Sequence, residues 1–192
     1  MILPSENVAE SNAEKIARLA EAARAMQVEL PAQPESESMT IGPLTHEAFR
    51  YIAHNMREWD RKEVFATQWT DDPEDLATAW EQRGPFSFVG STELPICAAG
   101  GVQMWPGVWS MWLLATDEWP AVATSVTKFV KRIIVPNLWA MGAHRLECRA
   151  MEGHPSRAWL EWLGFEREAT HHGYGKGKET FHTYVLTRQS CK

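Results

Sequence analysis

The sequence predicts an α/β protein with a mixed central sheet, helices on both faces of that sheet and an added N-terminal amphipathic helix. The first observation behind this prediction is a short apolar run at residues 108–114, followed by a long helical pattern and a second strand-like run at residues 144–150. A strand, crossover helix and strand of this length favours a parallel strand pair with a right-handed connection. The second observation is that strand-like runs with turn residues flank this unit on both sides, which extends the sheet.

The central unit can be justified element by element. Residues 108–114 are apolar and aromatic in a run too short for a globular helix, which favours a buried strand. Thr116 or Asp117 is expected to cap the following helix, with Pro120 in the first turn, where a missing N–H costs nothing. Apolar residues then recur at helical spacing, and Gly142 is expected to end the helix.

Before this unit, residues 1–38 are expected to hold a helix and a linker, and residues 39–192 a domain. A capping box begins at Ser11, and apolar residues recur at helical spacing over residues 12–28. Residues 31–38 are polar and contain prolines, which is typical of a linker. A single helix of this length is marginally stable alone, so its apolar stripe should pack either on its own domain or on a partner.

The remaining elements follow from periodicity and turn residues. Residues 45–67 are expected to be helical with a break near Asn55, and a further helix should begin at Asp72-Pro73 and end at Gly84. A short helix is expected over residues 155–163, with Gly164 as its stop. The other expected strands are residues 39–44, 86–90, 96–105, 165–170 and 181–187.

Charge and composition exclude several classes of function. The formal net charge of −6 argues against direct nucleic-acid binding. Residues 1–4 are too short for the apolar part of a signal peptide, and no run reaches membrane-spanning length, so an intracellular protein with no membrane partner is expected. The three cysteines have no metal-ligand spacing, and His171 and His172 should point to opposite faces of a strand, so no metal site is expected. The ten tryptophans fit either aromatic core packing or a contact surface.

The order strand, long helix, strand and short helix ending in W-L-G-F resembles the C-terminal half of the GNAT family of N-acetyltransferases, over residues 39–188. In that family a loop of pattern Q/R-x-x-G-x-G/A holds the pyrophosphate of CoA on backbone N–H groups. Residues 117–124 (DEWPAVAT) have no glycine and no basic residue there, but two acids and a proline. We therefore expect no cofactor. If acetyl-CoA does bind, the resemblance places its contacts at Leu114, Ala115, Ala121, Val122 and Thr124.

The sequence offers few residues suited to act as a general acid or a general base. The tyrosine that often acts as general acid in this family would fall near Leu160, which cannot donate a proton. Glu58 or Asp60 could take a proton from an amine, but both also fit ion pairs on a solvated helix face. His154 could accept an amine proton, since imidazole is a common general base, and it could equally cap the helix that follows. If the chain is catalytic, His154 and Glu58 are the expected residues; otherwise its catalytic residues are unknown.

A second resemblance is to small GNAT-fold proteins of short-tailed bacteriophages, related to internal virion protein A, over residues 50–188. It is carried by residues 55–69, 71–77, 105–112, 116–122 and 173–181. The resemblance implies a non-catalytic structural or accessory protein, made in the host cytoplasm and incorporated in the virion or used in its assembly. Its expected partners are other virion proteins or its own copies, through the N-terminal helix. The alternative is an acetyl-CoA-dependent N-acyltransferase that modifies a host or phage amine.

Overall fold

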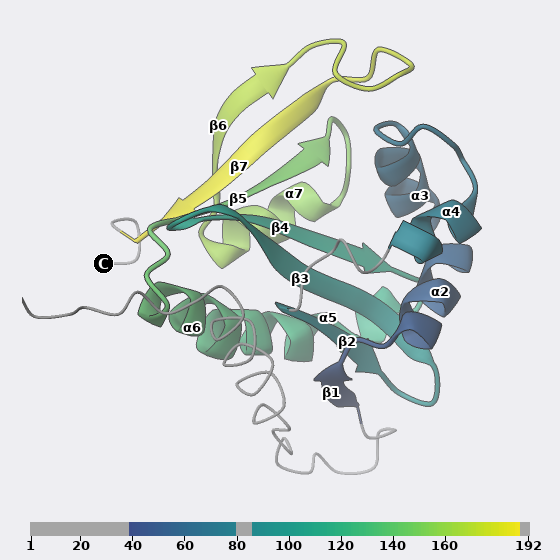
Figure 1. Ribbon diagram of the computed structural model, residues 1–192, viewed down its shortest axis with the longest axis horizontal. Coiled ribbons are helices and arrows are strands. Elements are labelled where there is room, and N and C mark those ends of the chain that lie inside the picture. Colours follow the sequence, from purple (N-terminus) through teal and green to yellow (C-terminus); the bar gives the residue numbers. More distant parts are fainter. Residues whose placement is uncertain (1–38, 80–85, 189–192) are drawn as a thin grey trace, which may run out of the picture.

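The computed structural model describes residues 39–79 and 86–188, and these form one seven-stranded mixed sheet with helices on both faces (Figure 1). The predicted fold class is confirmed. The helix predicted over residues 12–28 lies outside the described residues, so it and the division at residue 38 stay predictions. The strands, in sheet order, are β1 (Thr40–Pro43), β2 (Phe86–Ser91), β3 (Pro95–Trp105), β4 (Val108–Ala115), β5 (Arg145–Met151), β7 (Phe181–Thr187) and β6 (Glu166–His171).

The predicted parallel pair is present, and it is short. β4 and β5 are parallel and pair only at Val108 with Arg145, Trp109 with Leu146, and Ser110 with Glu147. All other neighbouring strands in the described sheet are antiparallel. Beyond the third pair the two strands diverge, so that β5, β7 and β6 turn away from β3 and β4 (Figure 1). This divergence leaves a space between β4 and β5.

The long helix after β4 is interrupted. It consists of α5 (Trp119–Phe129), a π-helical turn (Val130–Ile134) and α6 (Val135–Ala140). Pro136 lacks an N–H and cannot donate to the preceding turn, which accounts for the wider turn before it. The predicted cap is wrong: the N-cap residue is Glu118, and no side chain of the described residues caps the helix.

The helix predicted over residues 45–67 is broken as expected, into α2 (His46–His54) and α3 (Glu58–Phe65). The break is held by the end of β4, because the Arg57 N–H donates to the Ala115 carbonyl at 3.0 Å. α4 (Pro73–Thr78) begins with Asp72 as N-cap, while residues 80–85 of the predicted helix lie outside the described part of the chain. α7 (Ser156–Leu163) ends at Gly164, whose φ of +98° is left-handed and favours glycine.

Two apolar layers cover the sheet. The larger contains α5, α6 and α7 against the face that carries Trp109, Leu146 and Tyr184, and the smaller contains α2, α3 and α4 against the face that carries Leu114 and Trp112. Alternation along β4 places odd-numbered residues on the first face and even-numbered residues on the second. The core-packing interpretation of the tryptophans holds for Trp109, which is buried, whereas Trp69, Trp105 and Trp162 are exposed. The contact-surface interpretation stays a prediction.

Candidate functional site

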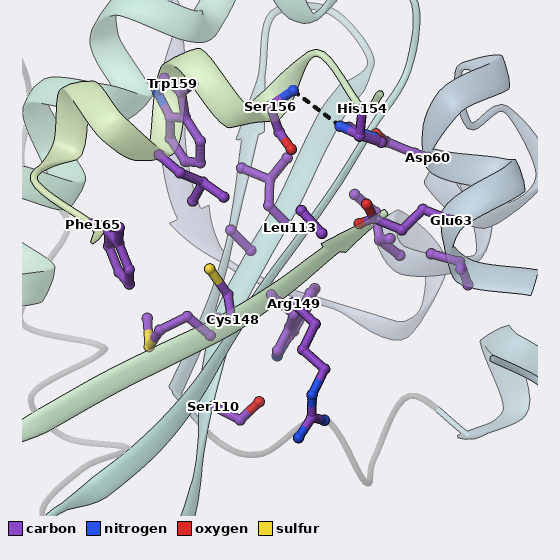
Figure 2. Close-up of a pocket in the computed structure, with 18 of the residues that line it drawn as sticks. Asp60, Glu63, Ser110, Leu113, Cys148, Arg149, His154, Ser156, Trp159 and Phe165 are labelled. Atoms are coloured by element: carbon purple, nitrogen blue, oxygen red, sulfur yellow. Dashed lines mark hydrogen bonds and ion pairs between the residues drawn. The ribbon is translucent and has the colours of Figure 1, made fainter. Parts of the chain in front are cut away.

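The two halves of the sheet separate at a cleft. A cavity of about 480 Å³ lies where β4 and β5 diverge, and consecutive β4 residues from Ser110 to Leu114 line it. Because consecutive strand residues point to opposite faces, the cleft extends through the sheet. On the α3 side it is lined by Glu63, Ser110 and Arg149, and on the α5 and α7 side by Leu113, Cys148 and Trp159 (Figure 2).

A buried charged network holds one wall of the cleft. One carboxylate oxygen of Asp60, Oδ1, accepts from Arg57 Nε at 2.9 Å and from His154 Nε2 at 3.0 Å. The other, Oδ2, accepts from the Ala115 N–H at 2.7 Å. Asp60 and His154 have side chains only 3% and 2% exposed. The network therefore ties α3, the end of β4 and the loop before α7 together around the cleft.

His154, a predicted base, uses both ring nitrogens in this network. Nδ1 accepts from the Ser156 N–H at 3.0 Å, as dashed in Figure 2. A backbone N–H can only donate, so Nδ1 is unprotonated and Nε2 carries the proton that it donates to Asp60. In this arrangement neither nitrogen can accept a proton from a ligand. The alternative interpretation from the sequence is that His154 caps the helix; the N-cap residue of α7 is Pro155, but His154 Nδ1 does accept the Ser156 N–H at the start of that helix.

Glu58, the other predicted catalytic residue, does not line the cleft. Its side chain is 78% exposed and pairs with Lys62 at 2.6 Å, one turn along α3. Sequence reasoning passed over Glu63, which does line the cleft and lies one helical turn after Asp60, on the same face of α3. That three-residue spacing was the signal that could have identified it.

Glu63 has the electrostatic properties of a site residue. Its Oε2 accepts from the Met151 N–H on β5 at 2.6 Å. Desolvation in the cleft is the main cause that raises its pKa above the ordinary value, and the hydrogen bond from the Met151 N–H opposes that rise. A carboxyl group with a raised pKa in a cleft is a candidate for proton transfer or for pairing with a cationic ligand.

This raised pKa predicts a pH-dependent stability difference for Glu63→Gln. The folded state holds the Glu63 proton more tightly than the unfolded chain, whose pKa is about 4.5, so wild-type stability is lost as the pH rises through the folded-state pKa. Glutamine keeps an oxygen for the Met151 N–H and does not ionise. We expect the variant to gain stability relative to wild type as the pH rises from 4.5 towards neutrality, measured by urea unfolding at several pH values.

Glu58→Gln on the exposed face of α3 is the matched control. A hydrogen bond from Lys62 lowers the pKa of Glu58, so this variant should show no such gain with rising pH. A stability difference between Glu63→Gln and wild type that is the same at every pH would show that Glu63 is not destabilised by ionisation.

At the end of the cleft near α5, the helix N-terminus offers few donors. The Trp119 N–H donates to the Thr116 carbonyl at 3.1 Å and the Ala121 N–H to the Glu118 carbonyl at 2.9 Å, while Pro120 has no N–H. The exposed Glu118 carboxylate accepts from the Thr116 hydroxyl at 2.5 Å, and this bond is the main cause that lowers the pKa of Glu118. A fixed negative charge stands where an anion-binding helix would present N–H groups.

The gap between α5 and α7 is bridged by aromatic side chains. The rings of Trp119 and Trp159 meet edge to face with centroids 5.6 Å apart. The Arg57 guanidinium lies 5.6 Å from the Trp119 ring, and Trp159 Nε1–H donates to the Thr127 hydroxyl at 2.8 Å. Both tryptophans line the cleft, so this edge-to-face pair forms its wall next to the start of α5.

Of the five residues predicted to contact CoA, only Leu114 lines the cleft. Ala115 is fully buried, and the network described above occupies its N–H and carbonyl. Val122 is fully buried in the core beneath α5. Ala121 and Thr124 are exposed on that helix.

The described part of the cleft does not favour thiol or metal chemistry. Burial raises the pKa of the Cys148 thiol, which disfavours the thiolate needed for nucleophilic attack. Within residues 39–79 and 86–188, no group of three His, Cys, Asp or Glu side chains is arranged to hold a metal ion. In the same residues, no helix combines the length and apolar character needed to cross a membrane.

Comparison with known proteins gives the fold. No family model and no curated protein matches the chain. Solved structures do match, among them a GNAT-family acetyltransferase from Bacillus anthracis, 11% identical with a TM-score of 0.59 over 81% of this chain and 98% of that chain. The ribosomal-protein-S18-alanine N-acetyltransferase from Escherichia coli is 14% identical with a TM-score of 0.57, over 78% and 93%. Ard1 from Thermoplasma volcanium is 11% identical with a TM-score of 0.59, over 78% and 97%. The described chain therefore has the fold of GNAT acetyltransferases.

Proposed function

We propose that this GNAT-fold protein does not use acetyl-CoA and acts as a non-catalytic accessory protein. The observation that carries the proposal is the first turn of α5. Two of its N–H groups are bonded within the chain, a third is absent at Pro120, and the acidic residues Asp117 and Glu118 directly precede it. The CoA pyrophosphate needs converging donors at this point, so both the charge and the missing donors oppose its binding.

The sequence resemblance to GNAT-fold proteins of short-tailed phages supports placing this role in the virion or its assembly. The amphipathic pattern of residues 12–28 supports contact with another virion protein or a second copy of the chain. The exposed tryptophans are compatible with protein contacts, because tryptophan is enriched at interfaces.

Incorporation into particles tests this role. Particles assembled with the full chain should contain it, and deletion of residues 1–38 should lower that content at least tenfold. The Glu63→Gln full chain is the control and should incorporate normally, because the proposed role needs no proton transfer. Normal incorporation of the truncated chain would contradict the proposed role of residues 1–38, and absence of the full chain from particles would contradict the virion assignment.

The divergence of β4 and β5 favours one second candidate, an N-acyltransferase. The Ala115 N–H points away from β3 to Asp60, and alternation directs the Leu113 N–H to the same side, into the gap left by β5. In this reaction an amine nitrogen would attack the thioester carbonyl carbon while Glu63 takes the amine proton. The Leu113 N–H would stabilise the oxyanion, and the departing thiolate would then take up a proton.

This candidate predicts turnover that depends on Glu63. An assay of acetyl-CoA with a panel of amines should then give acetylated product, and Glu63→Gln should lower kcat by about 10²-fold or more. Our first proposal predicts no product from either protein. Product formed by wild type and lost in Glu63→Gln would establish the enzyme and overturn the non-catalytic assignment.

A further inference from the structure

The α3 side of the cleft carries two opposite charges that the proposed function does not use. Glu63 reaches across from α3 to β5, where its Oε2 is held by the Met151 N–H. Arg149 comes from β5 itself, two residues earlier, so its side chain and that of Met151 leave the same face of the strand. Both Glu63 and Arg149 line the cleft. The opening of the cleft on the α3 side, here called the mouth, therefore presents an anionic side chain, Glu63, and a cationic one, Arg149.

Arg149 is not neutralised by a neighbouring carboxylate. Its guanidinium lies 5.4 Å from the centre of the Tyr174 ring, and within the described chain it forms no ion pair. Arg145, four residues earlier on the same face, shows the contrast: it pairs with Glu147 at 2.9 Å and with Glu168 at 2.5 Å. Figure 2 shows the Arg149 side chain extending towards Ser110 rather than towards Glu63. The two charges are separated across the mouth instead of satisfying each other.

The loop between β6 and β7 also borders the mouth. The segment between β6 and β7 is tied to the end of α3, because the Lys176 N–H donates to the Ala66 carbonyl at 2.8 Å and Lys176 Nζ pairs with Asp71. Tyr174, in the same loop, packs against Phe181 with ring centroids 5.3 Å apart. Tyr174 also lines the cleft, so this loop forms part of its wall.

We propose that this mouth binds a small zwitterion, with its ammonium group on Glu63 and its carboxylate on Arg149. Met151, which holds Glu63, and Arg149 are two residues apart on one face of β5, and the Arg149 side chain extends away from Glu63 (Figure 2). The ligand that reaches both groups is therefore a linear amino acid whose two charges are separated by a chain of methylene groups. An ammonium group would compensate the desolvated Glu63 carboxylate, and the planar guanidinium is suited to a carboxylate.

This inference goes beyond the proposed function, because it requires neither acetyl-CoA nor turnover. If the chain is an acyltransferase, the proposal also gives its substrate class as small amino acids, because the ammonium group would lie beside Glu63, the proton acceptor.

A series of amino acids with increasing charge separation tests the proposal by titration calorimetry without acetyl-CoA. Glycine, β-alanine, 4-aminobutanoate and 6-aminohexanoate are compared with butylamine and butanoate, which carry one charge each. We expect one amino acid to bind at least tenfold more tightly than either singly charged ligand. Arg149→Met and Glu63→Gln should each weaken it at least tenfold, whereas Arg132→Met, an exposed arginine outside the cleft, should not.

Arg149 is exposed, so its variant is expected to fold, which equal unfolding midpoints would verify. The proposal is overturned if no amino acid in the series binds saturably, if butylamine binds as tightly as the best amino acid, or if Arg149→Met leaves the affinity unchanged. None of these results bears on acetyl-CoA, so failure here is distinct from failure of the proposed function.

Discussion

Replacing Asp60 with alanine is expected to lower the free energy of unfolding by about 3–5 kcal/mol, because one change breaks a buried charged network. The variant would leave the Arg57 guanidinium, His154 Nε2 and the Ala115 N–H without their shared acceptor. Two of these groups are buried and cannot turn to water without local opening. Urea unfolding followed by tryptophan fluorescence measures the change.

Glu58→Ala is the control for this prediction. It removes a carboxylate from the same helix at an exposed position, so its cost should be far smaller than that of Asp60→Ala. A loss below about 1 kcal/mol for Asp60→Ala would mean that the network does not hold the cleft wall.

Replacing Leu146 with alanine is expected to cost about 2–5 kcal/mol, the range seen for buried leucines. Leu146 is fully buried and pairs with Trp109 in the short parallel contact between β4 and β5. Its side chain lines the cleft at the point where the strands begin to diverge. Truncation would enlarge the cavity where three residue pairs hold the two halves of the sheet together.

Leu94→Ala in the turn between β2 and β3 is the matched truncation. That leucine is 56% exposed, so the change should stay within about 0.5 kcal/mol. If urea titration gave similar losses in the free energy of unfolding for Leu146→Ala and Leu94→Ala, the parallel contact between β4 and β5 would not be a main source of stability.

Most of the described fold could be predicted from local patterns. The expected strand at residues 108–114 is one residue shorter than β4, and the one at residues 144–150 is shifted by one residue from β5, because apolar runs and turn residues define them directly. The π-helical turn was not predicted, since one proline inside a helical pattern does not determine how the helix adjusts. The wrong cap at Thr116 or Asp117 arose because either residue type fits a cap.

Sequence patterns could predict only those features of the site that depend on a single segment of the chain. The sequence alone shows that Pro120 has no N–H, and the hydrogen bonds at the start of α5 show that the N–H groups of Trp119 and Ala121 are already occupied. The contact between His154 and Asp60 joins residues 94 positions apart, and no local pattern encodes it. Glu63 looked like part of a solvated charged face, because helical spacing alone does not show that α3 turns that face towards β5.

Calorimetry with acetyl-CoA tests the central claim most directly, because the claim is that the start of α5 cannot hold the CoA pyrophosphate. We predict no saturable binding to the wild-type chain below about 1 mM, a weakness expected when the anion meets acidic groups instead of N–H donors. A micromolar dissociation constant for acetyl-CoA would contradict the account and restore the acyltransferase.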